Sequence, residues 1–485
     1  MKKVLAALLT ATMMAILLAG CGNTPAEEGN ANVAKTSAEG PMKVVDVNSG
    51  KNVTATDAVT TGGKVFNIYA WNEEFMGFFQ KYYTAEAPYL DTDNDGELDA
   101  YFEKAPGKHW VDEGITFNWI INPSNNGVYQ EKLDEALINQ ASAANDEKID
   151  MFLAEADYIT KYADSEYTAG VDALGTIDQS RIYDYTALAA ADANGVVKGC
   201  SFQCAPSALI YRRSLAKELL GTDNPAEVQA KLGTWEDFER VAEEISAKGY
   251  LMTPSFTEDF RVFSNNCSTA WVDENNNLTV PAEVLGWIEQ TKKFADLGAT
   301  KNAGVWDAEK NNEMAADGKT LCFFGPAWYF NFSMGPAHDE AMGDWAITKG
   351  PQSHFWGGTW MLAANGTDNG DIVADIMNAF LSNEDVIDGL VAIEGQYPNN
   401  VDIAAKYAND ATYGSEFLGG QNDIAMFSTM TADIKWQHHT IYDQILCESI
   451  QESFKDYFFG VIDEDTAWAN FYKRINEKYP EIVTP

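Results

Sequence analysis

The sequence predicts an α/β fold divided into two lobes, and three observations support this prediction. The chain has 485 residues, more than one hydrophobic core normally serves, so two lobes or more are expected. Its first ordered part alternates short apolar runs with amphipathic stretches in β-α-β-α-β order, which predicts a parallel sheet with right-handed crossovers. Residues 318–332 place an aromatic cluster directly after a strand, at the sheet edge where α/β folds bind ligands.

Residues 1–20 have the pattern of a secretory signal peptide. Lys2 and Lys3 precede an apolar run over 4–18, which is too short and too early for a transmembrane helix. The run ends in Leu-Ala-Gly-Cys, which resembles the lipobox of bacterial lipoproteins. That resemblance implies cleavage before Cys21, a diacylglycerol on its sulfur, and enough acyl chains, such as palmitate, for stable anchoring. Residues 21–60 are rich in small and polar residues and are expected to form a flexible tether.

The β-α-β-α-β unit follows the tether. Its strands are expected at 65–71, 115–121 and 149–154, and its helices at 74–83 and 128–144, with Leu133, Leu137 and Ile138 facing inward. Because parallel strands end at one edge, their flanking side chains should meet there. The candidate ligand-binding residues at this edge are Trp71, Asn72, Glu73, Asn122, Glu155 and Asp157. Flat apolar faces beside hydrogen-bonding groups suit a neutral polyhydroxylated ligand, although single residues such as Asn72 and Ser124 could instead cap helices.

An acidic insertion over residues 88–112 interrupts this unit. Its D-x-D-x-D-G spacing resembles the first half of an EF-hand calcium loop, in which alternate carboxylates converge on the ion. The candidate ligands are Asp91, Asp93, Asp95, Glu97 and Asp99, but the last EF-hand position falls on Phe102. A structural Ca²⁺ and a plain acidic surface loop remain alternatives, and no other cofactor is expected.

The middle of the chain changes in pattern. Strands are expected at 196–202 and 208–211, with a break at Pro206-Ser207 between them. Thr234-Trp235-Glu236-Asp237 predicts a capped helix start, and the apolar spacing over 284–294 predicts a one-sided helix. Later, a strand is expected at 345–349 and helices at 372–381 and in the apolar stripes after 446.

The aromatic segment begins with a buried strand over 321–324. Gly325-Pro326 should end this strand, because proline donates no N–H and glycine permits unusual backbone angles. The rings that follow are expected to divide into an exposed ligand surface, Trp328 and Tyr329, and core residues, Phe330 and Phe332.

Several segments, in order, resemble those of bacterial extracellular solute-binding proteins of family 1, the maltose-binding-protein-like subunits of carbohydrate ABC importers. They are GKTLCFFGPAWYF at 318, LIYR at 209, TWEDF at 234, the Gly-Gly at 357 and GQYPNN at 395. The resemblance implies a periplasmic-binding-protein-like fold with three interlobe crossings and a ligand cleft. It implies a first lobe over 61–203 and 358–396 and a second lobe over 204–357 and 397–485.

The resemblance also implies a function, sugar capture by hinge closure, with the importer's membrane subunits as partners. It adds cleft candidates in the second half of the chain, Asp259, Trp271, Trp356, Trp360 and Trp436. The protein is expected to be a monomer on the outer face of the cytoplasmic membrane, attached by its lipid alone, and not an enzyme.

The charge and the remaining motifs bound the alternatives. A formal net charge of −40 should repel nucleic acid and anionic lipid. Cys200, Cys204, Cys267, Cys322 and Cys447 are odd in number and are expected to be buried thiols.

The catalytic motifs G-x-S-x-G and H-E-x-x-H and the P-loop are absent, but a carboxylate pair of a carbohydrate-active enzyme stays an alternative. A calcium-dependent adhesin is a second alternative. Arg212 and Arg261 could form a clamp, so an anionic sugar or a peptide ligand also stays open.

Overall fold

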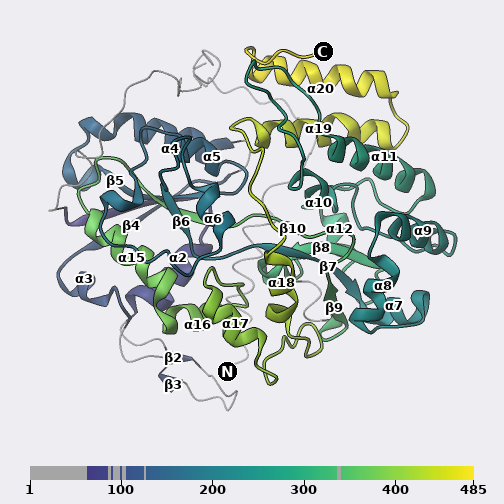
Figure 1. Cartoon of the computed structure of the whole chain (residues 1–485), viewed down its shortest axis with the longest axis horizontal. Helices are drawn as coiled ribbons and strands as arrows, with labels where there is room; N and C mark the ends of the chain where they lie inside the picture. Colours follow the sequence, from purple (N-terminus) through teal and green to yellow (C-terminus); the bar gives the residue numbers. More distant parts are fainter. Residues whose placement is uncertain (1–62, 86–88, 91–98, 101–104, 125–126, 336–339) are drawn as a thin grey trace, which may run out of the picture. The chain divides into compact units, whose positions relative to one another are not determined.

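In the computed structural model, residues 63–85, 89–90, 99–100, 105–124, 127–335 and 340–485 are described (Figure 1). They form two main sheets with helices packed on both faces of each (Figure 1). The α/β prediction is therefore confirmed.

The first sheet has five strands in the order β4-β1-β5-β11-β6. These are β4 (Thr116–Ile121), β1 (Val65–Ala70), β5 (Ile149–Glu155), β11 (Thr359–Ala363) and β6 (Gly199–Ser201). β1 runs parallel to β4 and β5, as the sequence predicts, whereas β11 runs antiparallel to β5 and β6. The expected strand at 196–202 is shorter in the structure, since only its centre pairs with β11.

Helices cover both faces of this sheet. One face packs on α2 (Glu74–Phe79), which continues as a π turn over Gln80–Thr84, and on α15 (Gly370–Ser382). The other face packs on α4 (Val128–Asn139) and α5 (Ile159–Ala163). β5 is central, so Met151 and Leu153 face α2 and α15 while Phe152 and Ala154 face α4 and α5. This two-sided burial explains the uninterrupted apolar run over 151–154 within β5.

The second sheet is organised around β7 (Pro206–Arg212), whose residues are all buried. β8 (Cys322–Pro326), β9 (Trp345–Thr348) and β10 (His354–Phe355) all pair with it in antiparallel fashion. The expected break at Pro206-Ser207 is wrong, because the first residue of a strand can lack a donated N–H and β7 begins at Pro206.

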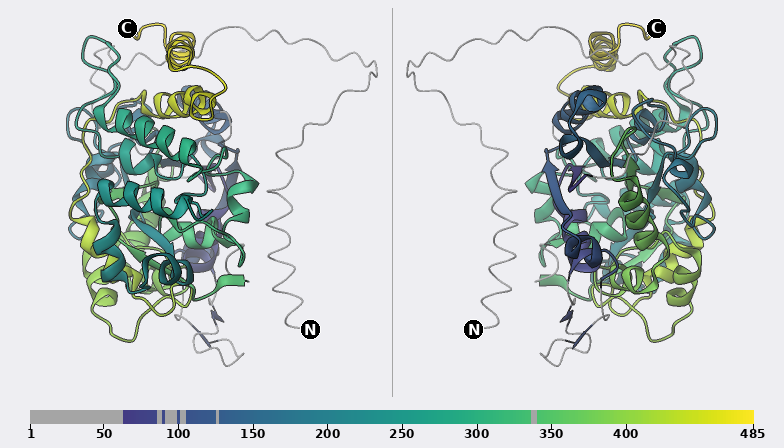
Figure 2. Two further views of the ribbon diagram at one scale, coloured as in Figure 1. Left: turned by 90° about the vertical axis from the view of Figure 1, so that its right-hand side faces the viewer. Right: turned by 90° about the vertical axis from the view of Figure 1, so that its left-hand side faces the viewer.

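The helices around this sheet follow the expected apolar spacing. Thr234 caps α9 by accepting a hydrogen bond at 3.1 Å from the Asp237 N–H, as predicted. Figures 1 and 2 show α20 lying over α19 at one end of the molecule, and these two helices pack on each other through their apolar stripes. The helices of this half are α7 (Arg213–Leu220), α8 (Pro225–Leu232), α9 (Trp235–Ser246), α10 (Phe260–Ser264), α11 (Ala282–Leu297), α12 (Ala308–Asn312), α13 (Ala327–Phe332), α17 (Val401–Ala408), α18 (Asp423–Thr431), α19 (Asp443–Phe458) and α20 (Glu464–Lys478). The remaining helices lie in the first half or just before α17, namely α3 (Lys108–Asp112), α6 (Asp184–Ala189) and α16 (Glu384–Ala392).

The chain passes between the two sheets through short segments. Residues 202–205 connect β6 to β7, residues 356–358 connect β10 to β11, and residues 393–400 lead from α16 to α17. The first and third segments run side by side, since the Cys204 N–H donates to the Tyr397 carbonyl at 3.0 Å. Asn399 also ties them together, because its Nδ2 donates to the Ser201 carbonyl at 2.8 Å. The exact lobe boundaries stay a prediction.

Several predictions fall on residues that the structure does not describe. Cys21 and residues 91–98 are among them, so the lipid site and the carboxylates Asp91, Asp93, Asp95 and Glu97 stay predictions. Asp99 lies in β3 (Asp99–Ala100), which pairs with β2 (Tyr89–Leu90). The acidic loop is therefore flanked by strands, whereas an EF-hand loop is flanked by helices. Among the described residues, no group of three or more His, Cys, Asp or Glu is placed to hold a metal ion.

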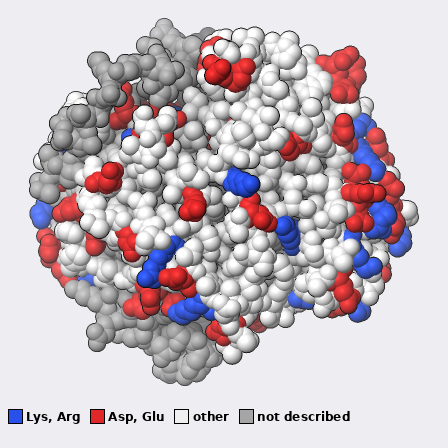
Figure 3. All heavy atoms as spheres, viewed as in Figure 1, with Lys and Arg blue, Asp and Glu red and all other residues white. Residues whose placement is uncertain are grey.

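Burial confirms some further expectations and corrects others. All five cysteines of the described part are free and buried, as expected. Ile138 is 55% exposed rather than inward, because it lies on the outer side of α4. No helix of the described residues is long and apolar enough to cross a membrane. Figure 3 shows acidic side chains spread over one whole face of the molecule, among fewer basic ones.

Candidate functional site

The site begins at the crossing between β10 and β11. Gly357 and Gly358 have φ angles of +76° and +113°, in the left-handed region that favours glycine. A Cβ on Gly357 would lie 3.4 Å from the Oε1 atom of Glu155 and 3.4 Å from the indole nitrogen of Trp328. Glu155 ends β5 of the first sheet, and Trp328 belongs to α13 beside the second sheet. The crossing therefore brings a carboxyl group and an indole from the two sheets to one backbone position.

Four aromatic side chains gather on the second-sheet side of this crossing, and we call them the aromatic group: Trp306, Trp328, Phe332 and Trp356. Trp356 lies between Trp328 and Trp306, with ring centroids 5.2 and 5.7 Å away. The ring of Phe332 contacts the two other tryptophans, with centroids 6.2 Å from Trp328 and 6.3 Å from Trp306. Trp306 is 59% exposed and Phe332 51% exposed, whereas Trp356 is buried. The group thus presents aromatic surface to solvent.

The position of Trp328 is fixed by a hydrogen bond, because its Nε1 donates to the Trp356 carbonyl at 3.1 Å. Trp328 is half-buried, so it is less exposed than expected, and its role at a ligand surface stays a prediction. The expected burial of Phe332 is wrong, since it lies at the solvent side of α13. Trp306 was not identified from the sequence. A large aromatic residue in the loop just before the Asp307 cap of α12 is the one signal that could have identified it.

Tyr329 is buried, so its expected exposure is wrong. Its hydroxyl donates to Glu258 Oε1 at 3.0 Å, and the Lys310 Nζ lies 4.5 Å above its ring. Burial lowers the pKa of Lys310 to about 8, and burial raises the pKa of Glu258 despite the nearby lysine. These buried polar contacts hold α13, and with it Trp328, against the second sheet.

A second set of contacts joins the two sheets through an ion pair. The Asp157 carboxylate follows β5 and accepts hydrogen bonds from both terminal nitrogens of Arg261 on α10, at 2.6 and 2.5 Å. Glu155 Oε2 accepts from the Asp157 N–H at 2.7 Å. Burial and the Asp157 charge raise the pKa of Glu155, against the opposing effect of Arg261. The end of β5 therefore presents one carboxyl group to the crossing and one to Arg261.

A narrow pocket lies beside this ion pair, between the segment after β5 and the helices α10 and α19. Its volume of about 10 Å³ has room for about one water molecule. A second hydrogen bond between elements of the two halves runs from Gln130 on α4 to Gln444 on α19, at 2.8 Å. The lining residues are Ala156, Asp157, Thr160, Arg261, Ser264, Asn265, Phe355, His439, Thr440, Asp443 and Cys447.

The other candidates after β1 and β4 lie near the first-sheet edge. Trp71 is half-buried and packs edge-on against Tyr129 and Tyr158, with centroids at 5.8 and 6.2 Å. Asn72 accepts a hydrogen bond from the Glu74 N–H at 3.1 Å, but it lies one residue before Glu73, the N-cap residue of α2, which has no side-chain cap. Glu73 is exposed and Asn122 is half-buried.

Two second-lobe candidates lie in the core, away from any surface. Trp271 is 2% exposed and packs against Phe471, so its placement as a cleft wall is wrong. Asp259 is 3% exposed and accepts a hydrogen bond at 2.6 Å from Gln290 of α11, so it faces the interior of the second sheet's helices. Both residues were predicted from the resemblance, which does not tell which side chains of the segment around α10 are covered by α11 and α20.

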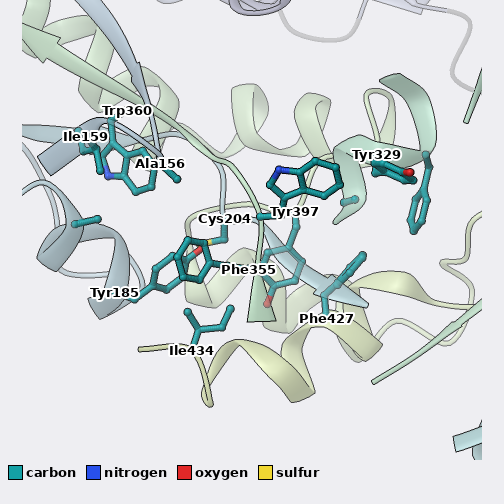
Figure 4. Packing of buried hydrophobic residues seen from close by; sticks show 14 of the residues in the cluster. Ala156, Ile159, Tyr185, Cys204, Tyr329, Phe355, Trp360, Tyr397, Phe427 and Ile434 are labelled. Atoms are coloured by element: carbon teal, nitrogen blue, oxygen red, sulfur yellow. The ribbon is translucent and has the colours of Figure 1, made fainter. Parts of the chain in front are cut away.

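The last two tryptophan candidates, Trp360 and Trp436, lie next to residues that line the pocket. Trp360 is buried, and its Nε1 donates to the Thr186 carbonyl at 2.8 Å. Figure 4 shows its ring close to Ile159 and Ala156, in the apolar cluster under the pocket. Trp436 is half-buried and stacks on the lining residue His439, with centroids 3.9 Å apart.

Arg212 does not contribute to a ligand clamp. It is buried, and its guanidinium donates to the carbonyls of Ala315 and Ala316, both at 2.7 Å, and to the Asp344 carboxylate at 3.1 Å. These contacts hold β7 to the segment before β8, a structural role.

Comparison with known proteins agrees with this architecture. Residues 98–415 match the sequence profile of a family described as bacterial extracellular solute-binding protein. The chain therefore belongs to this family of extracellular binding proteins.

Solved structures with the same fold share little sequence with the chain. A protein described as extracellular solute-binding protein family 1 superposes with a TM-score of 0.67 at 15% identity, covering 85% of this chain and 99% of that one. An ABC-transporter-associated binding protein of Bifidobacterium animalis subsp. lactis, solved with β-1,6-galactobiose, gives 0.62 at 15% identity, covering 87% and 100%. The galacto-N-biose/lacto-N-biose I-binding protein of Bifidobacterium longum gives 0.60 at 11% identity, covering 87% and 98%. These likenesses confirm the two-lobed solute-binding fold.

One curated relative matches over a short stretch. An uncharacterised protein of Mycoplasma pneumoniae is 39% identical over 80 residues, which make up 16% of this chain. The match spans 12% of that protein's length.

Proposed function

We propose that this protein captures a sugar or oligosaccharide outside the cell and delivers it to an ABC importer. The observation that carries the proposal is the crossing at Gly357, where the Glu155 carboxyl group and the aromatic group converge from the two sheets. Aromatic faces stack on the apolar faces of sugar rings, and carboxyl oxygens accept hydrogen bonds from hydroxyl groups. Family membership and the sugar complexes of the two bifidobacterial proteins support the same ligand class.

Hinge closure is the mechanism that we propose. A ligand that touches both lobes at once binds the closed form more tightly, so it shifts the population toward closure. Asp157 and Arg261 already meet across the two sheets, and short segments connect those sheets. The closed, loaded form would be recognised by the importer's membrane subunits.

Binding without turnover is the second part of the proposal. Both oxygens of Asp157 accept hydrogen bonds from Arg261, so this carboxylate is poorly placed to act as a nucleophile beside Glu155. Incubation with a bound sugar should leave that sugar intact on chromatography. Release of a shorter product would favour the carbohydrate-active enzyme instead.

The test of sugar capture is calorimetric titration of residues 60–485 with neutral mono- and oligosaccharides. We expect saturable binding of at least one sugar, and Trp328→Ala should weaken it at least about tenfold, since a stacked aromatic ring is worth roughly 0.5–1.5 kcal/mol plus its buried area. Trp468→Ala, which changes a half-buried tryptophan on α20, is the matched control and should bind normally. Binding of peptides and of no sugar would reject the proposal.

We further propose that a lipid on Cys21 anchors the protein to the outer face of the membrane. The basic and apolar pattern of residues 1–20 and the Leu-Ala-Gly-Cys sequence support this location. Cys21→Ser should release the protein from the membrane fraction and abolish labelling by radioactive palmitate. Unchanged membrane retention of the variant would contradict the anchor.

A further inference from the structure

The ion pair between Asp157 and Arg261 lines the pocket between the segment after β5 and the helices α10 and α19. Arg261 comes from α10 and Asp157 from the segment after β5, so the pair spans the two halves of the pocket. Its two parallel hydrogen bonds, at 2.6 and 2.5 Å, form the bidentate geometry that makes such pairs strong and directional. The Arg261 side chain is only 17% exposed and the Asp157 side chain 24%, so water screens the attraction between their charges little.

Carboxyl groups outnumber cationic groups around this pair. Glu155 precedes Asp157 by two residues, and Asp443 lines the same pocket from α19. Glu448 lies one turn further along α19, where the charges of Asp157 and Arg261 both act on it. The basic residues in the lining are Arg261 and His439, and His439 Nδ1 lies 3.2 Å from Asp443. Arg261 is therefore a single guanidinium within an acidic neighbourhood.

These contacts determine what a ligand of each charge would meet. An anionic group that bound Arg261 through the two N–H groups now donated to Asp157 would displace Asp157, and this would leave a mostly buried carboxylate unpaired beside Glu155. Breaking a buried pair in this way is strongly unfavourable. A hydroxyl group requires no such exchange, and an ammonium group would add a cation beside the carboxyl groups of Asp157 and Asp443.

We propose that Asp157 and Arg261 together determine specificity, so that the site accepts neutral and amino sugars and rejects acidic sugars. The inference rests on the proposed function, because the Asp157 N–H is bonded to Glu155, the carboxyl group that the proposed sugar site presents at the crossing. It also answers the question that the sequence left open, since neither Arg212 nor Arg261 is free to clamp an anion.

The experiment uses a glycan array that carries matched neutral, uronic-acid and amino forms of each sugar, followed by titration of the forms that bind. The wild-type protein should bind the uronic-acid form at least about tenfold more weakly than the neutral form, as expected for an added like charge near partly buried carboxylates. The amino form should bind at least as well as the neutral form.

Two variants should change this ratio in opposite directions. Asp157→Asn frees the guanidinium and should raise the affinity for the uronic-acid form relative to the neutral form about tenfold. Arg261→Gln removes the cation and should lower the same ratio. Opposite shifts cannot come from general loss of folding. Asp134→Asn breaks the Lys161–Asp134 pair elsewhere on α4 and α5, at 2.6 Å, and should leave the ratio unchanged.

The outcomes separate the two proposals. If no form of any sugar binds, the proposed function is wrong. If neutral sugars bind but the wild-type protein binds uronic acids equally well or better, the charge preference alone is wrong. An unchanged ratio in Asp157→Asn would also overturn the inference.

Discussion

Two tryptophans of the second sheet's half have opposite surroundings. Trp306 is 59% exposed at the edge of the aromatic group, whereas Trp271 is 2% exposed within the core formed with α11, α19 and α20. The amino-acid type is the same, so the difference in role comes from what each ring touches. Substitution by alanine should therefore separate binding from stability.

We predict that Trp306→Ala lowers sugar affinity about tenfold while changing the free energy of unfolding by less than about 0.5 kcal/mol, as for an exposed side chain. Trp271→Ala should cost about 3–5 kcal/mol of unfolding free energy, because it removes a large ring from a packed core. Titration and urea unfolding of both variants provide the measurements. A strongly destabilised Trp306→Ala variant, or one with unchanged affinity, would show that this ring does not belong to the site.

The junction of β8 and α13 matters at the scale of elements, because it orients Trp328. Gly325 lies directly under the ring of Tyr329, and a Cβ there would approach Tyr329 Cγ to 2.5 Å. Tyr329 cannot move away easily, since its hydroxyl is bonded to the buried Glu258. The absence of a side chain at Gly325 is therefore what allows the helix to start immediately after the strand.

We predict that Gly325→Ala destabilises the protein by about 1–3 kcal/mol through overpacking and weakens sugar binding by displacing α13. Gly77→Ala is the control, because a Cβ at Gly77 in α2 meets no atom within 4 Å. That substitution should stabilise the protein by about 0.5–1 kcal/mol. Urea unfolding midpoints and titrations would test both. Equal effects of the two substitutions would contradict the steric account of the junction.

Buried titratable groups make the free energy of unfolding of the whole molecule depend on pH. Burial raises the pKa of Asp150 to about 6, of Asp259 to about 7 and of Asp423 to about 6. In the other direction, burial lowers the pKa of His354 to about 3. Each buried carboxyl group keeps a proton that it loses on unfolding, so its contribution to stability is full in acid and is lost as the pH rises through these values. His354 acts oppositely, and its contribution is lost as the pH falls below about 6.5.

We predict that the free energy of unfolding falls between pH 5 and pH 8, because three carboxyl groups outweigh one imidazole there. The growing negative charge of an already acidic chain acts in the same direction. Asp259→Asn should make the loss between pH 5 and pH 7 smaller by about 2–3 kcal/mol, at roughly 1.4 kcal/mol per pH unit for one group. Chemical unfolding at pH 5, 6, 7 and 8 measures both. Stability that increases toward pH 8 would contradict the prediction.

The local sequence pattern was enough to predict many of the helices and strands of this protein. Apolar runs and one-sided spacing identified β1, β4, β5, α2, α4, α9 and α11, because each element's period follows from its own backbone geometry. Composition alone established the acidic charge. The order of short segments was enough to predict the two-lobed solute-binding fold. Glu155, Trp328 and Trp356 were predicted as ligand-binding candidates of three separate segments, and the structure brings all three to the Gly357 crossing.

The tertiary structure alone decided which side chains meet and which are exposed. Asp157 and Arg261 are 104 residues apart in the sequence, and no local period predicts that their charges pair. Likewise, Phe332 was expected among the core rings of the aromatic segment and the family resemblance placed Trp271 at a cleft wall, and the structure reverses both placements. The burial of a side chain depends on which distant segments cover it. The partner of a charged side chain depends on which opposite charges the packing of those segments brings within a few ångströms.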